Sequence, residues 1–189
     1  MQTRYPDMPT DRAISRAHRA LGHVVGFIRL QVDMMAGPRD LVGLTRLLNG
    51  VNYMRWYGGV AHHAAEHVLF ERLLEKEPSA RDLCQALADQ HGSFEARERE
   101  IMNDICYACD GDRDAFARLR DEIVEYCYIH IAHIEREEAE LLPLARKSLS
   151  SHDWQAVQAS FEAAAARVPA PDDRILEDPG LVVEVKMLH

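Results

Sequence analysis

The sequence has little of what marks membrane-spanning, secreted or nucleic-acid-binding proteins. No run of about 18 apolar residues occurs, so no membrane-spanning helix is expected. The polar segment 1–11 does not resemble a secretion signal. Lysine and arginine are not clustered and the net charge is −9, which argues against nucleic acid and against an anionic membrane surface as partners. We therefore expect a cytoplasmic protein.

Cysteine is also scarce. Four cysteines in 189 residues are too few for a domain held together by disulfides. Cys106 and Cys109 form a C-x-x-C pair, but the βαβ context of a thioredoxin-like motif and the second pair of a zinc knuckle are both missing. We expect buried or half-buried thiols at the end of a helix, and a redox-active pair stays open as the alternative.

Strand alternation and internal repeats are absent, whereas helical periodicity recurs in four long stretches. The stretches cover about 11–35, 39–74, 80–109 and 113–149, and turn signals such as Gly37-Pro38 and Asp110-Gly111-Asp112 separate them. Short connections between long amphipathic helices favour antiparallel neighbours. The prediction is an all-α protein with an antiparallel up-down-up-down four-helix bundle in 1–150. Residues 151–189 are expected to form a short extra C-terminal helix and a tail of the same domain.

Histidine, by contrast, is abundant, with ten residues. Each of the four apolar stripes is interrupted by histidine or glutamate where leucine or valine would be expected. Two of the interruptions are H-x-x-x-E pairs, whose members lie four apart and so project from one face of a helix. Burying glutamates without partners costs several kcal/mol, so we expect shared cations to compensate them. The six interrupting residues are His18, His62, Glu66, His91, His133 and Glu137.

The donor chemistry of this set indicates a metal site. Mixed imidazole and carboxylate ligands suit iron, manganese or zinc. Two carboxylates from different helices can bridge two ions, and four histidines can then cap the ions in pairs.

These residues resemble the hemerythrin-like, or HHE cation-binding, domain family. The family pattern is a histidine in the first helix, then H-H-x-x-E, a single histidine, and H-x-x-x-E. Here the pattern reads AHRAL around His18, HHAAEHVLF from His62, DQHGS around His91 and HIEREEAELLPLA from His133. The similarity covers roughly residues 14–148, and the S-x-x-D-W from Ser150 is similar to a trailing segment of bacterial members.

The resemblance implies a non-haem di-iron site inside a four-helix bundle. One iron would take His18 and His62, and the other would take His91 and His133. Glu66 and Glu137 would bridge the two irons, which an oxo or hydroxo group could also link.

Two departures from the oxygen-carrying hemerythrins argue against reversible oxygen carriage. Those proteins have a second histidine four residues after the one in the third helix, where this chain has Glu95. Their last motif is H-x-x-x-x-D, whereas this chain has H-x-x-x-E from His133. Either Glu95 or His130, one turn before His133, is a possible additional ligand.

Three further polar residues are expected to lie outside the ligand set. His63 points about 100° away from His62 on an α-helix, so we expect it to pack or hydrogen-bond in an outer position. His67 shares that outer face and is expected to be solvated. Glu98 is expected to be an ordinary polar residue of a helix face.

The leading functional hypothesis is a cytoplasmic di-iron protein that binds or senses oxygen, nitric oxide or peroxide, with no catalytic residue assigned. A second hypothesis is a di-iron enzyme, or an iron donor for damaged iron-sulfur clusters under peroxide or nitrosative stress. Such an enzyme needs a proton or electron route, which Tyr126, Tyr128 or the cysteines could provide. A third hypothesis is an iron store or a structural site for zinc or manganese.

Overall fold

The computed structural model describes residues 9–168, and the predicted tail beyond them lies outside the described part. Two short π-helical segments, η1 (Met54–His62) and η3 (Glu137–Leu141), and a 3₁₀ turn, η2 (Pro78–Ala80), occur among the α-helices. None of the helices in residues 9–168 combines the length and apolar character needed to cross a bilayer. The α-helices are α1 (Pro9–Met34), α2 (Leu41–Tyr53), α3 (His63–Lys76), α4 (Arg81–Asp110), α5 (Arg113–Arg136), α6 (Leu142–Ser148) and α7 (Ser151–Ala165).

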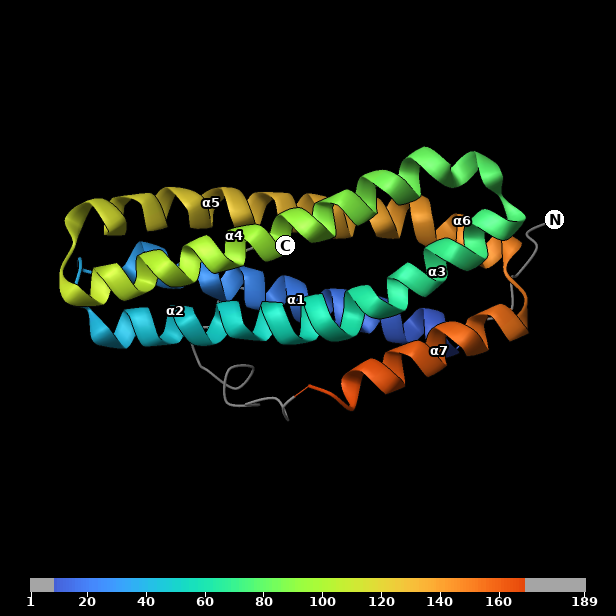
Figure 1. Cartoon of the computed structure of the whole chain (residues 1–189), viewed down its shortest axis with the longest axis horizontal. Helices are drawn as coiled ribbons and strands as arrows, with labels where there is room; N and C mark the ends of the chain where they lie inside the picture. Colours follow the sequence, from blue (N-terminus) through green and yellow to red (C-terminus); the bar gives the residue numbers. More distant parts are fainter. Residues whose placement is uncertain (1–8, 169–189) are drawn as a thin grey trace.

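The elements form four long helical runs that lie along the longest axis of the molecule (Figure 1). The runs are α1, then α2–η1–α3, then α4, then α5–η3–α6. Both α1 and α4 pack against α2 and α5, which closes the bundle. The additional helix α7 packs along α3. The predicted all-α antiparallel bundle with an extra C-terminal helix is confirmed.

The turn between α4 and α5 shows how the sequence reverses the chain. Gly111 adopts a left-handed φ of +98° and its N–H donates to the carbonyl of Ala108 at 3.0 Å, which ends α4. The Asp112 side chain then accepts hydrogen bonds from the N–H groups of Asp114 and Ala115 at 2.8 and 2.9 Å, which begins α5. The tight connection makes α4 and α5 antiparallel neighbours.

The apolar core consists of two separate clusters. The first cluster joins the C-terminal half of α1, α2, and the halves of α4 and α5 that meet at their shared turn. The second cluster joins the start of α1 and of α4 to α3, α6 and α7. The first includes Leu21, Val25, Ile28, Leu44, Val51, Met54, Ile101, Ile105, Leu119 and Tyr126, and the second includes Ile14, Leu69, Leu73, Cys84, Leu87, Leu141, Trp154 and Val157.

The close approach of α1 and α2 predicts opposite effects for two glycine substitutions. A Cβ on Gly50 would lie 2.7 Å from Cγ1 of the fully buried Ile28, whereas a Cβ on Gly22 would meet nothing within 4 Å. Alanine in a helix gains about 1 kcal/mol over glycine, but overpacking costs about 1–3 kcal/mol. We expect urea unfolding to show Gly22→Ala more stable and Gly50→Ala less stable than the wild type. Equal gains for both variants would contradict the close packing.

Candidate metal centre

The six predicted ligand residues form one buried layer between the two apolar clusters. His18 lies between Ile14 of the second cluster and Leu21 of the first, and the other three runs change cluster at the layer in the same way. Both π-helical segments border the layer, because η1 ends at His62 and η3 begins at Glu137. Such segments often mark functional sites. The fold therefore brings together side chains that are up to about 120 residues apart in the sequence.

Within the layer the donor atoms form two half sites. In the first half site, Nε2 of His18 is 3.2 Å from Oε1 of Glu66 and 3.2 Å from Oε2 of Glu137. His62 completes this half, with its Nε2 2.8 Å from the same Glu66 oxygen.

The second half site contains the other two histidines and the other carboxylate oxygens. Nε2 atoms of His91 and His133 are 3.1 Å apart, so both rings aim at one region. Oε2 of Glu66 is 3.5 Å from His91 Nε2, and Oε1 of Glu137 is 3.3 Å from His133 Nε2. Each glutamate thus turns one oxygen toward each pair of histidines.

The hydrogen bonding of the layer is incomplete in a way that a cation would correct. Five of the buried side-chain atoms without a hydrogen bond in residues 9–168 belong to three residues of the layer, His62, Glu66 and Glu137. The 2.8 Å approach of His62 to Glu66 has the distance of an ion pair but not the geometry of a hydrogen bond. Buried polar atoms without partners are costly. The donor set and its unpaired atoms fit metal ions in both half sites.

Outer hydrogen bonds hold the Nε2 atoms of three histidines toward the centre. Nδ1 of His18 donates to Oε1 of Glu138 at 2.7 Å, and Nδ1 of His133 donates to Oε1 of Gln90 at 2.9 Å. Nδ1 of His91 is 3.1 Å from Nε2 of His67. An imidazole that donates from Nδ1 keeps the Nε2 lone pair free when neutral, which is the arrangement that metal-binding histidines use.

Within the layer a proton on His18 offsets part of the charge of the glutamates. Burial opposes charge on His18, but the neighbouring carboxylates of Glu137, Glu138 and Glu66 outweigh it and raise the His18 pKa to about 11. Burial would raise the pKa of Glu66, yet the charge of His62 and the hydrogen bond and charge of His18 hold it well below 4.5. Burial lowers the pKa of His91 to about 4. At neutral pH the layer therefore contains an imidazolium at His18 in the first half site and a neutral ring at His91 in the second.

Sequence reasoning placed His63 in an outer position, and the structure places it against the layer. Its ring is 9% exposed and stacks on His91 with centroids 3.7 Å apart. The π-helical turns of η1 explain the difference, because more residues per turn bring consecutive side chains closer in direction than α-helical spacing assumes. His67 is exposed, as expected, but its ring contacts His91.

The two possible additional ligands lie apart from the two half sites. Glu95 is exposed on α4. His130 is buried, but its ring packs on Phe94 and Tyr126, with centroids 3.7 and 4.3 Å away. Neither residue belongs to the two close groups of donor atoms. A ligand role for either one stays a prediction.

A cavity of about 520 Å³ leads from the surface to the second half site. Its buried walls are His63, His91, Phe94 and Glu98, and its exposed lining includes Trp56 and Glu95. The lining contains no ligand of the first half site. The cavity therefore gives access to one half of the layer.

Glu98 is a buried acid in this cavity wall, not the ordinary surface residue expected from the sequence. It is 3% exposed, and its Oε1 accepts a hydrogen bond from the Tyr126 hydroxyl at 2.9 Å. Burial raises the pKa of Glu98 to about 7, although the Tyr126 hydrogen bond and the charge of Arg55 oppose the shift. The signal was present in the sequence, because Glu98 continues the apolar stripe of His91, Phe94 and Ile101.

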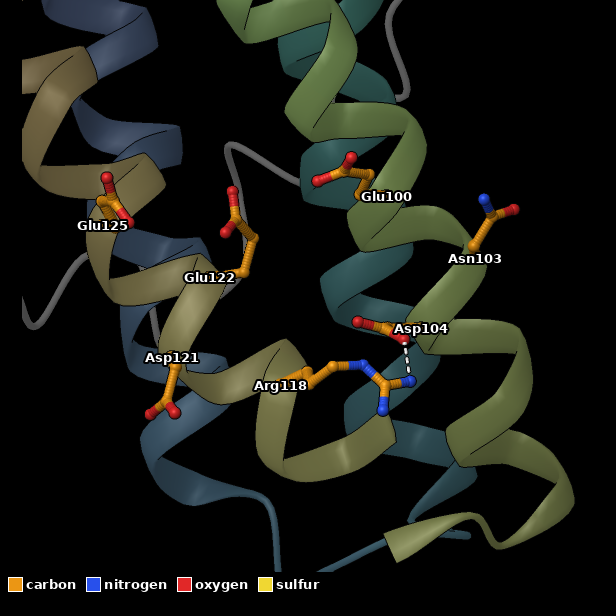
Figure 2. Close-up of a pocket in the computed structure, with 7 residues that line it drawn as sticks. All are labelled: Glu100, Asn103, Asp104, Arg118, Asp121, Glu122 and Glu125. Atoms are coloured by element: carbon orange, nitrogen blue, oxygen red, sulfur yellow. Dashed lines mark hydrogen bonds and ion pairs between the residues drawn. The ribbon is translucent and has the colours of Figure 1, made fainter. Parts of the chain in front are cut away.

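A second hollow lies between α4 and α5, and Figure 2 shows its charged lining. Arg118 donates to Asp104 at 2.7 Å across it. Arg97 pairs with Glu122 and, at 2.8 Å, with Glu125. Within residues 9–168 the close groups of metal-type donors lie in the buried layer and not in this hollow.

The cysteines are free thiols away from the layer. Cys84 and Cys127 are buried in the apolar clusters, Cys109 is half-buried and Cys106 is exposed. The expectation of a buried or half-buried thiol holds for Cys109 and is wrong for Cys106, because Cys106 faces outward near the end of α4.

No family model, curated protein or solved structure matches the chain. The molecule is an all-helical bundle whose buried histidines and glutamates form two adjoining groups able to hold metal ions. The groups are His18, His62, Glu66 and Glu137, and His63, Glu66, His91 and His133.

The buried acid predicts a pH-dependent gain of stability on substitution. The folded pKa of Glu98, about 7, exceeds the ordinary 4.5, so the stability that its protonated form contributes is complete below pH 4.5 and is lost as the pH rises through 7. We expect the free energy of unfolding of Glu98→Gln to rise relative to that of the wild type, both without added metal, by up to about 3 kcal/mol between pH 4.5 and 8. Urea unfolding at several pH values measures this. In Tyr126→Phe the loss of stability should extend to higher pH, because the hydrogen bond that lowers the Glu98 pKa is gone. If the unfolding free energies of wild type and Glu98→Gln changed in parallel with pH, the raised pKa would be contradicted.

Proposed function

We propose that this chain binds two iron ions in its buried layer and uses them to bind or sense a small diatomic or redox ligand. The observation that supports the proposal most is that the two oxygens of each glutamate face different half sites. Glu66 and Glu137 each turn one oxygen to each pair of histidines, which is the arrangement that two bridged ions require.

The proposed assignment follows the two half sites. His18 and His62 would hold the first ion, and His91 and His133 would hold the second. Glu66 and Glu137 would serve as ligands shared by the two ions. Imidazole and carboxylate donors also suit manganese or zinc, and the choice of iron rests on the similarity of the motifs to hemerythrin-like domains.

The protein's own groups would hold, orient and shield the ions. The hydrogen bonds of Glu138, Gln90 and His67 keep three imidazoles directed inward. The apolar clusters pack on both sides of the layer, and the cavity beside His91 leads to its second half site. Iron in such a site supplies two accessible oxidation states and open positions for oxygen, nitric oxide or peroxide.

The cavity walls favour a ligand that exchanges protons over one that is carried and released unchanged. Glu98, whose pKa burial raises to about 7, lines the cavity with the Tyr126 hydroxyl 2.9 Å away. Near neutral pH its carboxyl group can therefore give a proton to, or take one from, a group in the cavity. The proposed role is therefore a sensor or binding protein that reacts with its ligand, and an enzyme acting on peroxide is the second candidate.

The bridging assignment predicts the metal content of three variants. After reconstitution with iron, the wild type should contain two irons per chain that are magnetically coupled. Glu66→Ala and Glu137→Ala should each lose the coupling and at least one iron, because each of these glutamates has one oxygen within 3.5 Å of a histidine in each half site. The matched control is Glu140→Ala, an exposed acid on the same helical run, which should keep both irons.

Elemental analysis, Mössbauer spectroscopy and the visible absorption spectrum measure these outcomes. A reproducible maximum of one metal per chain would rule out the dinuclear site. Two tightly bound ions of zinc without a visible spectrum in the protein as purified would favour a structural site over a redox-active one.

The raised pKa of His18 predicts proton release on metal binding. The His18 ring is protonated in the metal-free protein up to a pH of about 11, so a metal ion must displace that proton at neutral pH. Adding Fe²⁺ to weakly buffered metal-free protein at pH 7.5 should release at least one proton per chain, and the apparent affinity should rise with pH. A pH-indicator dye measures the release. His18→Gln should release one proton fewer, and equal release from both proteins would show that His18 is not displaced.

A further inference from the structure

His63 lies where a further ligand of the second ion would lie. It is the first residue of α3, directly after His62 and the π-helical segment. One of its ring nitrogens is within 4.8 Å of donor atoms of Glu66, His91 and His133. The same ring forms part of the buried wall of the cavity. His63 thus lies between the solvent-connected cavity and the second half site.

In the orientation that the structure shows, the ring nitrogens of His63 and His91 lie close together but their lone pairs do not converge on one position. The two rings are parallel to within 3° and their centroids are 3.7 Å apart. An imidazole nitrogen presents its lone pair in the plane of its ring. An ion in the plane of His91 therefore lies in a parallel plane above or below that of His63, outside the reach of its lone pair.

The second half site leaves room for one more donor. His91, His133 and one oxygen each of Glu66 and Glu137 supply four protein donors. An iron ion with octahedral coordination has six positions, so two stay open. The first half site also has four donors, but its ligands do not line the cavity. Only the second ion is placed to exchange a position with groups in the cavity.

The side chain of His63 can change its orientation within the space around it. Histidine has two side-chain torsions, and its ring moves between staggered rotamers about the first of them. The 520 Å³ cavity adjoins the ring on one side. The stack on His91 is a contact between ring faces, with no hydrogen bond between the two rings to hold it.

We propose that His63 is an exchangeable fifth protein ligand of the second ion. Stacked on His91, it leaves a position open to a small anion from the cavity. Turned inward, it fills that position itself. The proposal rests on the di-iron site proposed above and adds an internal competitor for the external ligand.

Azide binding to the diferric protein tests the competition. We compare wild type with His63→Ala, which removes the ring, and His63→Phe, which keeps a ring on His91 but has no nitrogen. Both variants should keep two irons and bind azide about threefold or more tightly, because the competing nitrogen is gone. Titration followed by the azide-to-iron absorption band measures the affinity, and X-ray absorption of the azide-free proteins should show fewer coordinated imidazoles in both variants.

Each contrary outcome overturns the proposal and identifies the reason. If only His63→Ala binds azide more tightly, the ring acts as a steric plug. If neither variant differs from wild type, His63 only packs on His91. If either variant loses one iron, His63 is a permanent ligand. If the wild type itself fails to bind two irons, the proposed function fails first, which the metal analysis shows before any azide is added.

Discussion

The compensation of charge in the middle of an apolar bundle is the constraint on which the rest of this structure depends. Two carboxylates and four imidazoles share one buried layer, where leaving either glutamate unpaired costs several kcal/mol. A proton on His18 offsets part of this charge. The outer partners Glu138 and Gln90 then settle which nitrogen of His18 and His133 faces the centre.

The backbone is also adapted to this constraint. Both π-helical segments occur at the layer, and the two helical runs that contain them are the runs that supply the glutamates. A π turn shifts the following residues around the helix axis, so His62 and Glu66 reach the centre while the apolar residues on either side still pack in their clusters. The backbone of each helical run must therefore place residues correctly in the layer and in both apolar clusters.

The fold and the six central residues could be predicted from the sequence because both depend on periodicity within single helices. Apolar stripes define the runs, and residues that interrupt a stripe must face the interior. Periodicity was less reliable where the helix is not α-helical, so His63 was placed outward. It also does not report contacts between helices, such as those of Glu138 with His18 and Gln90 with His133. Glu98 interrupted a stripe without a partner four residues away, and only the fold shows Tyr126 beside it.

Because the core is separated into two clusters, the polar layer forms the middle of the bundle. Each cluster contains residues from all four helical runs, so each end of the bundle is held together by its own apolar contacts. A substitution in the layer therefore leaves the apolar contacts at both ends of the bundle in place. Because each end has its own apolar contacts, we expect a change in the layer to alter the helix spacing there without unfolding the ends of the helical runs. The cavity beside His91 opens at this level of the bundle, between the two apolar clusters.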